Sequence, residues 1–325
     1  ALKHEWVNHL HMGPGQGLTL GVETRKESFD SGGRRVFGSP MGDFVITERS
    51  DAEARTDALY GQYRFTAGGR LDGVLGVRVD DHEDFAPETT VRLAPVYRFP
   101  DRGLRVFASV GTGFKAPSLY ELHGFSPDNF GTAYRGNPDL KPERARAVDL
   151  GVEHSAGPWR QGLTVFRSEV DDLIQRVFLP SFDSTSENVA EATIQGLEVF
   201  AAGPLGDRAR LRVDYTFTDA EDGAGEALLR RPRHQLDLDL SWRPSPRAQV
   251  SLWGQFLGGR TDVDAQGNTV EPGGYGLLHL AGSYDLGPET SVYARVSNLL
   301  DREHEPVVGF AGRDRGVYAG LRGRF

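Results

Sequence analysis

Apolar and polar residues alternate along most of this 325-residue chain, and that alternation restricts its possible folds more than any other feature. A two-residue repeat is the side-chain repeat of a β-strand. In residues 209–217 the odd positions are apolar or aromatic, and the even positions are mostly charged; 235–243 and 292–297 repeat the pattern. Glycine, at 41 residues, is about 13% of the chain against a usual ~7%, and it destabilises helices. We therefore expect an all-β fold.

The same reading predicts about 15 strands. Many would be about 11–15 residues long, whereas strands of globular proteins usually have ~5–6 residues. Tilted strands of ~9–11 residues or more fit an antiparallel up-and-down β-barrel that crosses a membrane. The predicted strands lie near 2–10, 17–30, 53–67, 70–84, 88–99, 102–114, 143–154, 159–175, 186–202, 207–220, 231–244, 247–260, 273–286, 289–301 and 312–325.

The connections between these strands alternate between short turns and long loops. The short turns are rich in glycine and proline, as in 67–69, 203–206 and 287–288. The one exception is the connection near 85–88, which is short where a long one is due. Such alternation is typical of a chain that meanders through a membrane. The predicted long loops are 31–52, 115–142, 176–185, 221–230, 261–272 and 302–311.

The polar face of the predicted sheet carries many charges. They include Arg210, Arg212, Asp214, Asp237 and Asp239. In a small closed barrel these charges would be buried at high cost, but the wet lumen of a wide barrel keeps them hydrated. We therefore expect the charged face to line the lumen and the apolar face to point outward. A large soluble sheet with one solvated face is the alternative, and the strand lengths and loop alternation favour the membrane barrel.

Composition and missing motifs exclude several classes of protein. The chain has no cysteine, which excludes a disulfide scaffold, a cysteine-ligated zinc site and a thiol nucleophile. A net charge of −9 argues against a nucleic-acid partner. No hydrolase, zinc-protease or phosphate-loop motif is present, so we expect neither catalysis nor a metal or cofactor. Residues 262–268 are similar to a calcium loop, but Gly273 stands where the last carboxylate belongs, which favours a plain hairpin.

Five segments, taken in order, resemble the barrel of TonB-dependent outer-membrane receptors. The resemblance covers essentially the whole chain and is strongest to the cobalamin and siderophore receptor group. A final strand that ends in Phe325 completes it. The segments are Gly-Thr-Gly-Phe-Lys-Ala-Pro-Ser-Leu-Tyr-Glu-Leu (111–122), Gly-Asn-Pro-Asp-Leu-Lys-Pro-Glu (136–143), Asp-Asp-Leu-Ile (171–174), Ala-Thr-Ile-Gln-Gly-Leu-Glu (192–198) and Val-Ser-Asn-Leu-Leu-Asp-Arg (296–302).

This resemblance implies a 22-stranded barrel filled by an N-terminal plug. Residues 1–325 would then be a single domain, the C-terminal part of the barrel with about 15 of 22 strands. The plug, its energy-coupling box and the first strands would lie outside this chain. Counted back from an inward last strand, the long loops fall on the outside of the cell. Whether such a fragment closes as a smaller barrel is left open.

The resemblance also implies a function. The intact protein would be a receptor and transporter in the outer membrane of a Gram-negative bacterium, taking up a ferric siderophore or cobalamin. Its partners would be outer-membrane lipid, the barrel-assembly machinery, the metal-chelate ligand and, through the plug, the TonB–ExbB–ExbD complex. The sequence does not separate siderophore from cobalamin.

Candidate ligand-binding residues lie on the long loop 115–142. They are Tyr120, Phe125, Phe130, Tyr134 and Arg135, because exposed aromatic residues on long loops often contact ligands. Packing within the loop, or an outer aromatic girdle, is the alternative reading. The charges on the polar face would face the plug. By the same resemblance, Phe325 would belong to the signal that the barrel-assembly machinery reads.

Two other functions stay open at this point. A passive diffusion porin of ~14–16 strands would need its first and last strands to pair. A hydrolase carried on a barrel would need a serine and a histidine at one rim. Ser118 and His123 lie near each other in sequence but have no acidic partner or oxyanion motif beside them.

Overall fold

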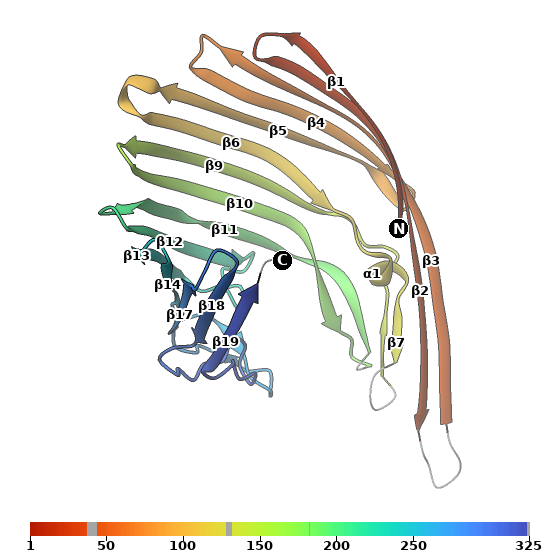
Figure 1. Ribbon diagram of the computed structural model, residues 1–325. Coiled ribbons are helices and arrows are strands. Elements are labelled where there is room, and N and C mark those ends of the chain that lie inside the picture. Colours follow the sequence, from red (N-terminus) through yellow and green to blue (C-terminus); the bar gives the residue numbers. More distant parts are fainter. Residues whose placement is uncertain (38–43, 128–131, 182, 324–325) are drawn as a thin grey trace. The chain divides into compact units, whose positions relative to one another are not determined.

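The computed structural model describes residues 1–37, 44–127, 132–181 and 183–323, most of which lie in β-strands (Figure 1). Fifteen strands in this described part are at least eight residues long, as the sequence predicts. They are β1 (Leu2–Gly13), β2 (Gln16–Phe37), β3 (Phe44–Ala67), β4 (Leu71–His82), β5 (Phe85–Phe99), β6 (Leu104–Lys115), β9 (Glu143–Ala156), β10 (Trp159–Phe178), β11 (Ser184–Leu205), β12 (Ala209–Asp222), β13 (His234–Ser245), β14 (Ala248–Leu257), β17 (Tyr275–Asp285), β18 (Thr290–Ser297) and β19 (Gly316–Gly323).

The remaining elements are short. The helix α1 (Leu119–His123) and the strands β7 (Phe125–Pro127) and β8 (Ala133–Arg135) lie in one long connection, and β15 (Asp262–Val263) and β16 (Thr269–Val270) lie in another. The 3-10 turn η1 (Pro100–Arg102) joins β5 to β6. Among the described residues, no helix has the length and apolarity needed to cross a bilayer.

The chain divides into two compact units. The first contains residues 1–97, 108–148 and 168–193, and the second contains residues 98–107, 149–167 and 194–325. β5, β6, β9, β10 and β11 therefore contribute one segment to each unit. Each unit is described by itself below.

In the first unit, β1 to β5 form an antiparallel meander (Figure 1). β2 pairs with β1 only up to Lys26, and β3 pairs with β4 only from Thr56. Beyond these points residues 27–37 and 44–54 pair with each other. β2 and β3 therefore continue as a two-stranded ribbon past the ends of their neighbours.

This ribbon corrects the prediction of a long loop over 31–52. Residues 31–37 and 44–52 are in register with each other, with Ser31 opposite Ser50 and Val36 opposite Val45. Val36 and Val45 are both exposed. α1 and β7 cover one side of this ribbon only in part, and Ser31 and Gly33 on that side are small, so the sequence of 31–37 carries no hydrophobic alternation and does not read as strand. The connection between β4 and β5 is short, as expected, because Glu83 and Asp84 alone separate the two strands.

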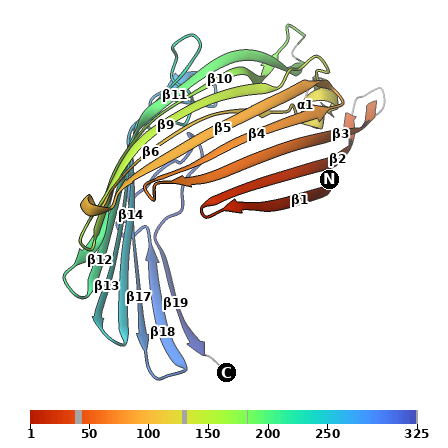
Figure 2. The ribbon, with the colours of Figure 1, turned by 90° about the horizontal axis from the view of Figure 1, so that it is seen from above.

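In the second unit, β12, β13, β14, β17, β18 and β19 follow one another as antiparallel neighbours (Figure 2). The turns from β13 to β14 and from β17 to β18 are short, whereas 258–274 and 298–315 are long connections. The hairpin predicted over 262–268 is confirmed, because Asp262 pairs with Val270 and Val263 with Thr269. Its tip is closed by Asp264, whose carboxylate accepts from the backbone N–H groups of Gln266 and Asn268.

Several bulky rings lie across a neighbouring strand at a glycine. A Cβ atom on Gly21 would lie 2.1 Å from the ring of Tyr60, and one on Gly162 would lie 2.4 Å from the ring of Phe200. Any side chain larger than hydrogen would displace these rings. Covering a strand glycine with an aromatic ring is a recognised way to fix sheet register. Part of the glycine excess of this chain thus serves strand pairing.

Candidate functional site

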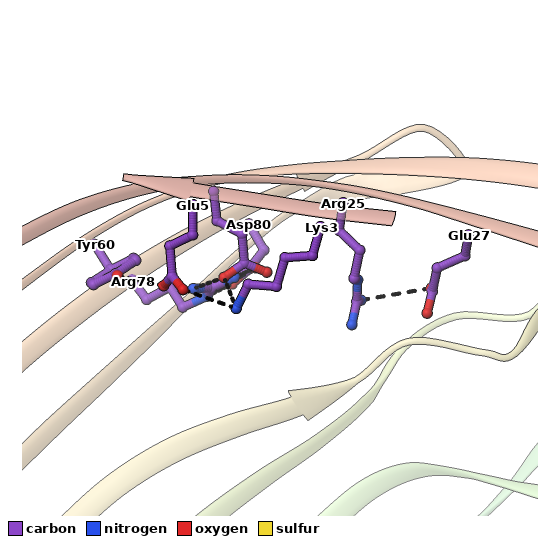
Figure 3. Close-up of polar contacts among 8 residues, drawn as sticks. Lys3, Glu5, Arg25, Glu27, Tyr60, Arg78 and Asp80 are labelled. Carbon is purple, nitrogen blue, oxygen red and sulfur yellow. Dashed lines mark hydrogen bonds and ion pairs between the residues drawn. The ribbon is translucent and has the colours of Figure 1, made fainter. Parts of the chain in front are cut away.

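The polar face of the first unit carries a connected group of charges (Figure 3). Strand register places Glu5 opposite Glu23 on β1 and β2, and Tyr60 opposite Arg78 on β3 and β4. Residues opposite each other on paired strands point to the same side of the sheet. The side chains in Figure 3 accordingly lie below their strands, on one side.

We call the group Lys3, Glu5, Glu23, Tyr60, Arg78 and Asp80 the charge network. Lys3 Nζ lies 3.3 Å from Glu5 and 3.2 Å from Glu23. Arg78 donates to Glu23 at 3.2 Å and to Asp80 at 2.7 Å. The hydroxyl of Tyr60 donates to Glu5 at 2.6 Å, which is possible because Gly21 leaves room for the ring (Figure 3).

The five charges predicted for the polar face lie together in the second unit. Register places Arg212 opposite Asp239 and Asp214 opposite Asp237. Arg212 and Asp214 form an ion pair at 2.5 Å. Asp237 accepts from the side-chain amides of Gln235 and Gln255 at 2.7 and 3.3 Å. Arg210 lies opposite Ser241, two residues along the same face. The opposite face of these strands is apolar, with Leu211, Leu240, Leu252, Leu280 and Val296 on it.

The connection from β6 to β9 begins with a capped helical turn. The Ser118 side chain accepts from the backbone N–H of Glu121, and the Glu121 carboxylate accepts from the backbone N–H of Ser118. This reciprocal capping box explains why a five-residue helix forms here. It also gives Ser118 and Glu121 a structural role. α1 and β7 pack against β2 and β3 (Figure 1), where the ring of Phe29 meets that of Tyr120 edge-on at 5.8 Å.

Two pairs of the predicted ligand-binding residues are brought together in this connection. Tyr120 stacks on Tyr134, with ring centres 4.8 Å apart, and the guanidinium of Arg135 lies 5.1 Å from the ring centre of Phe125. Tyr134 is 3% exposed and Phe125 8%, whereas Tyr120 is 37% exposed and Arg135 is also exposed. Of these four residues, Tyr120 and Arg135 are the two that are exposed. Phe130 lies outside the described residues.

Tyr134 is held on several sides. Its hydroxyl shares a hydrogen bond with Ser186 at 2.9 Å, and the guanidinium of Arg176 lies 5.2 Å from its ring centre. Burial raises the pKa of the Tyr134 phenol above its usual value. The phenol therefore stays neutral over the physiological pH range.

Two asparagines fix this connection to β11. Asn137 donates to the carbonyl of Ser186 at 2.9 Å. Asn188 accepts from the backbone N–H of Lys141 at 2.8 Å and donates to the carbonyls of Lys141 and Asp172 at 2.9 and 2.7 Å. Asn137 belongs to a motif that the sequence singles out, but Asn188 does not. Only its position between charged and apolar residues of a predicted strand marks Asn188, and that signal is weak.

A second polar cluster lies between the long connections of the second unit. Asp262 is 0% exposed, and its carboxylate accepts from the backbone N–H groups of Val263 and Val308 and from Arg230 Nε, all within 3.0 Å. These bonds, the one from Val308 foremost, hold the pKa of Asp262 at about 2. Asn298 is also buried, and its side chain binds the backbone of Arg302 and the carbonyl of Arg313. Neither residue stands out in the sequence pattern as an organiser of these loops.

Long antiparallel strands with one charged and one apolar face, joined by ordered long connections, agree with a known family. Residues 2–299 match the family model described as TonB dependent receptor-like, beta-barrel. The chain belongs to this family. Its members are receptors and transporters of the Gram-negative outer membrane, and not enzymes.

Individual relatives agree with the family assignment. The chain is 30% identical over 324 residues to the vitamin B12 transporter BtuB of Photobacterium profundum, covering 97% of this chain and 48% of that protein. A mutant ferric enterobactin receptor of Pseudomonas aeruginosa shares the fold with a TM-score of 0.79 at 22% identity, covering 99% of this chain and 53% of the other. The ferripyoverdine receptor of the same species gives 0.77 at 15% identity, covering 99% and 47%. The chain thus spans about half the length of the relatives it matches.

Membership confirms the fold class and the outer-membrane location predicted from the sequence. In outer-membrane barrels the apolar face of the sheet meets lipid and the polar face lines the interior. Phe325, the predicted assembly signal, lies outside the described residues.

Proposed function

We propose that this chain is the C-terminal part of the barrel domain of a receptor that takes up a scarce metal complex, a ferric siderophore or cobalamin, across the outer membrane. The proposal rests on the family match over residues 2–299, together with the BtuB and siderophore-receptor relatives. In this account the long connections capture the complex outside the cell. A plug in the remainder of the protein then couples its entry to the TonB–ExbB–ExbD complex.

The two parts of the structure support different steps of this function. The described parts of the connection, 116–127 and 132–142, are held by Asn137, Asn188 and the Tyr120–Tyr134 stack, and they offer Tyr120 and Arg135 at the surface. The charge network gives the first unit a polar face. The second unit has one of its own, with the charges Arg210, Arg212, Asp214, Asp237 and Asp239. A plug that moves during transport needs such a hydrated contact surface, because breaking solvent-exposed ion pairs costs little free energy.

We further propose that outer-membrane lipid and the barrel-assembly machinery are partners, with Phe325 as part of the assembly signal. A row of apolar side chains on β12 to β19 fits the lipid face, and Val317 and Leu321 of β19 are among the most exposed large apolar residues. The assembly role of Phe325 is tested by truncating the last residue and measuring the amount of folded receptor in the membrane.

Uptake of labelled ligands tests the proposal. The intact gene is expressed in a strain that lacks its own receptors, and uptake of cobalamin, a catecholate and a hydroxamate ferric siderophore is measured separately. We expect one class to be taken up with saturable kinetics at nanomolar to micromolar concentration. No uptake of any metal complex, together with steady conductance of the intact protein in planar bilayers, would instead show a diffusion porin.

A further inference from the structure

A continuous series of ring contacts runs through the first unit, and we call its members the aromatic column. The ring of Tyr120 meets that of Phe29 edge-on at 5.8 Å and stacks on that of Tyr134 at 4.8 Å. The guanidinium of Arg176 then lies 5.2 Å from the ring centre of Tyr134 and 5.8 Å from that of Phe178. Both distances are within reach of a cation–π contact. The aromatic column thus joins β2, the connection 116–142 and β10, and its members are Phe29, Tyr120, Tyr134, Arg176 and Phe178.

The β10 end of the aromatic column is open to solvent. Phe178 is 75% exposed, the highest value among the large apolar side chains that the structure describes, and Arg176 is exposed beside it. These two residues stand two apart on one strand, so they share a side of β10. At its other end the column lies on the charged side of β2, because Phe29 alternates in step with Glu23. The exposed ring is therefore outside the apolar face, where such a ring marks an interaction site.

Arg176 is held in place by a neutral group. Its Nε donates to the hydroxyl of Ser184 at 2.8 Å, and Ser184 is 2% exposed. Register places Ser184 next to Tyr134, where β11 pairs with β8. The guanidinium makes no other hydrogen bond with a residue that the structure describes. Its Nη groups are therefore left to donate to a ligand.

The positive charge of Arg176 is not neutralised by an ion pair. Arg176 and the nearby Arg135 contact aromatic rings, and neither pairs with a carboxylate in the described part of the chain. Arg144 of the same unit, by contrast, pairs with a carboxylate at 2.5 Å. Two carboxylates flank the aromatic column, those of Glu121 and Asp183, but each accepts from a backbone N–H group instead. The column thus presents an exposed ring and an exposed guanidinium side by side.

We propose that Arg176 and Phe178 bind the aryl rings of a ferric catecholate, so that the metal complex which the receptor takes up belongs to the catecholate class. An iron-bound catecholate is a flat, electron-rich ring, which stacks on Phe178 and attracts the guanidinium of Arg176. The complex also carries a net negative charge, which matches the Nη donors. A hydroxamate complex offers no aryl ring, and cyanocobalamin has no net charge, so neither uses both features. This inference rests on the proposed uptake function and selects one of the ligands that it leaves open.

Binding of radiolabelled complexes to the intact receptor in detergent tests the ligand class. A ferric tris-catecholate, a ferric tris-hydroxamate and cyanocobalamin are titrated separately. We expect the catecholate to bind at least about tenfold more tightly than the other two. Tighter binding of the hydroxamate or of cyanocobalamin overturns the inference and leaves the proposed uptake function standing. Binding of none of the three overturns both.

Substitutions in the aromatic column test the site. Phe178→Leu keeps an apolar side chain but removes the ring, and it should weaken catecholate binding about fivefold. Arg176→Gln should weaken it about tenfold, and Arg176→Lys less, because lysine keeps the charge. The matched control is Arg102→Gln, which removes an exposed arginine at the other end of β6 and leaves binding unchanged. Equal catecholate affinity in wild type, Phe178→Leu and Arg176→Gln overturns the inference.

Competition with ferric citrate separates the ring from the charge, because this complex is anionic and has no aryl ring. We expect an excess of ferric citrate to leave catecholate binding almost unchanged. Displacement of the catecholate by ferric citrate at equal concentration would show that charge alone is recognised, and it would overturn the catecholate assignment. This measurement uses the wild-type receptor, so it decides the matter even where Arg176→Gln does not fold.

Discussion

The connection 116–142 and the connections around Asp262 are held in place by different kinds of contact. Both are long, and in both a side-chain amide or carboxylate binds backbone groups, from the half-buried Asn188 in the first and from the buried Asp262 in the second. In the first, Tyr120 stacks on Tyr134, and the side-chain amide of Asn188 makes hydrogen bonds to the backbone, so the anchoring groups are paired. In the second, charges do the anchoring, and Arg260 keeps two nitrogens without an acceptor. The comparison teaches that neutral contacts leave the anchoring groups of the first connection paired, while the charged groups of the second are paired fully at Asp262 and only in part at Arg260.

The largest effect is expected at Asn188. Asn188→Ala removes three hydrogen bonds to the backbone of Lys141 and Asp172, which lowers the free energy of unfolding by about 2–4 kcal/mol. Denaturant unfolding of the purified protein measures the loss. Asn8→Ala, a change of the same size on β1, is the control and stays close to wild type. A loss of under about 0.5 kcal/mol at Asn188 would show that the connection does not depend on this anchor.

Asp262 should show that the second region depends on charge. Asp262→Asn keeps the shape but loses the ion pair with Arg230, and we expect cleavage within 258–315 by a protease to become about tenfold faster. The connection 116–142 serves as the internal control, because its cleavage rate should not change. Equal acceleration in both connections would mean that the substitution destabilises the whole fold.

Low pH should also loosen the region around Asp262. The folded pKa of Asp262, about 2, lies below its ordinary value of 3.8. A lowered folded pKa contributes stability that is fully present above the unfolded value and is lost as pH falls through the folded one. Pepsin cleavage within 258–315 should therefore rise between about pH 4 and pH 2, and Asp262→Asn should remove that dependence. An unchanged pH profile in Asp262→Asn would assign the acid sensitivity to other groups.

A substitution at Tyr134 should have a smaller effect on the connection 116–142. Tyr134→Phe keeps the stack on Tyr120 and loses only the hydrogen bond with Ser186, so the expected cost is about 0.5–1.5 kcal/mol. Ser186→Ala removes the same bond from the other side. In a double-mutant cycle the two changes should not add, and full additivity would mean that the bond contributes nothing.

The smallest effect is expected in the charge network. Tyr60→Phe removes the hydrogen bond to Glu5, but Lys3 still pairs with that carboxylate, and both Lys3 and Glu5 are exposed. Exposed ion pairs and hydrogen bonds contribute little to stability. The melting temperature should therefore stay within about 2 °C of wild type. A larger drop would indicate that the polar face is shielded from water.

The strands were predictable because burial on one face imposes a two-residue repeat. This held for β12, β13 and β18, where Leu211, Leu240 and Val296 share the apolar face. It failed for 31–37 and 44–52, which pair as a ribbon that is only partly covered and whose sequence carries no apolar repeat. The anchors Asn188, Asp262 and Arg260 were not predictable, because their importance comes from backbone groups and partners far away in sequence. A single polar residue carries no mark of which distant backbone group it binds.

Coupling of uptake to energy tests the central claim most directly. In cells that express the intact receptor, binding and uptake of the one ligand class that it transports are measured before and after the proton-motive force is dissipated. The account predicts that uptake stops while surface binding persists, because the barrel captures the complex and an energised plug admits it. Uptake that continues unchanged without the proton-motive force would contradict the account and would indicate a barrel through which the ligand diffuses passively.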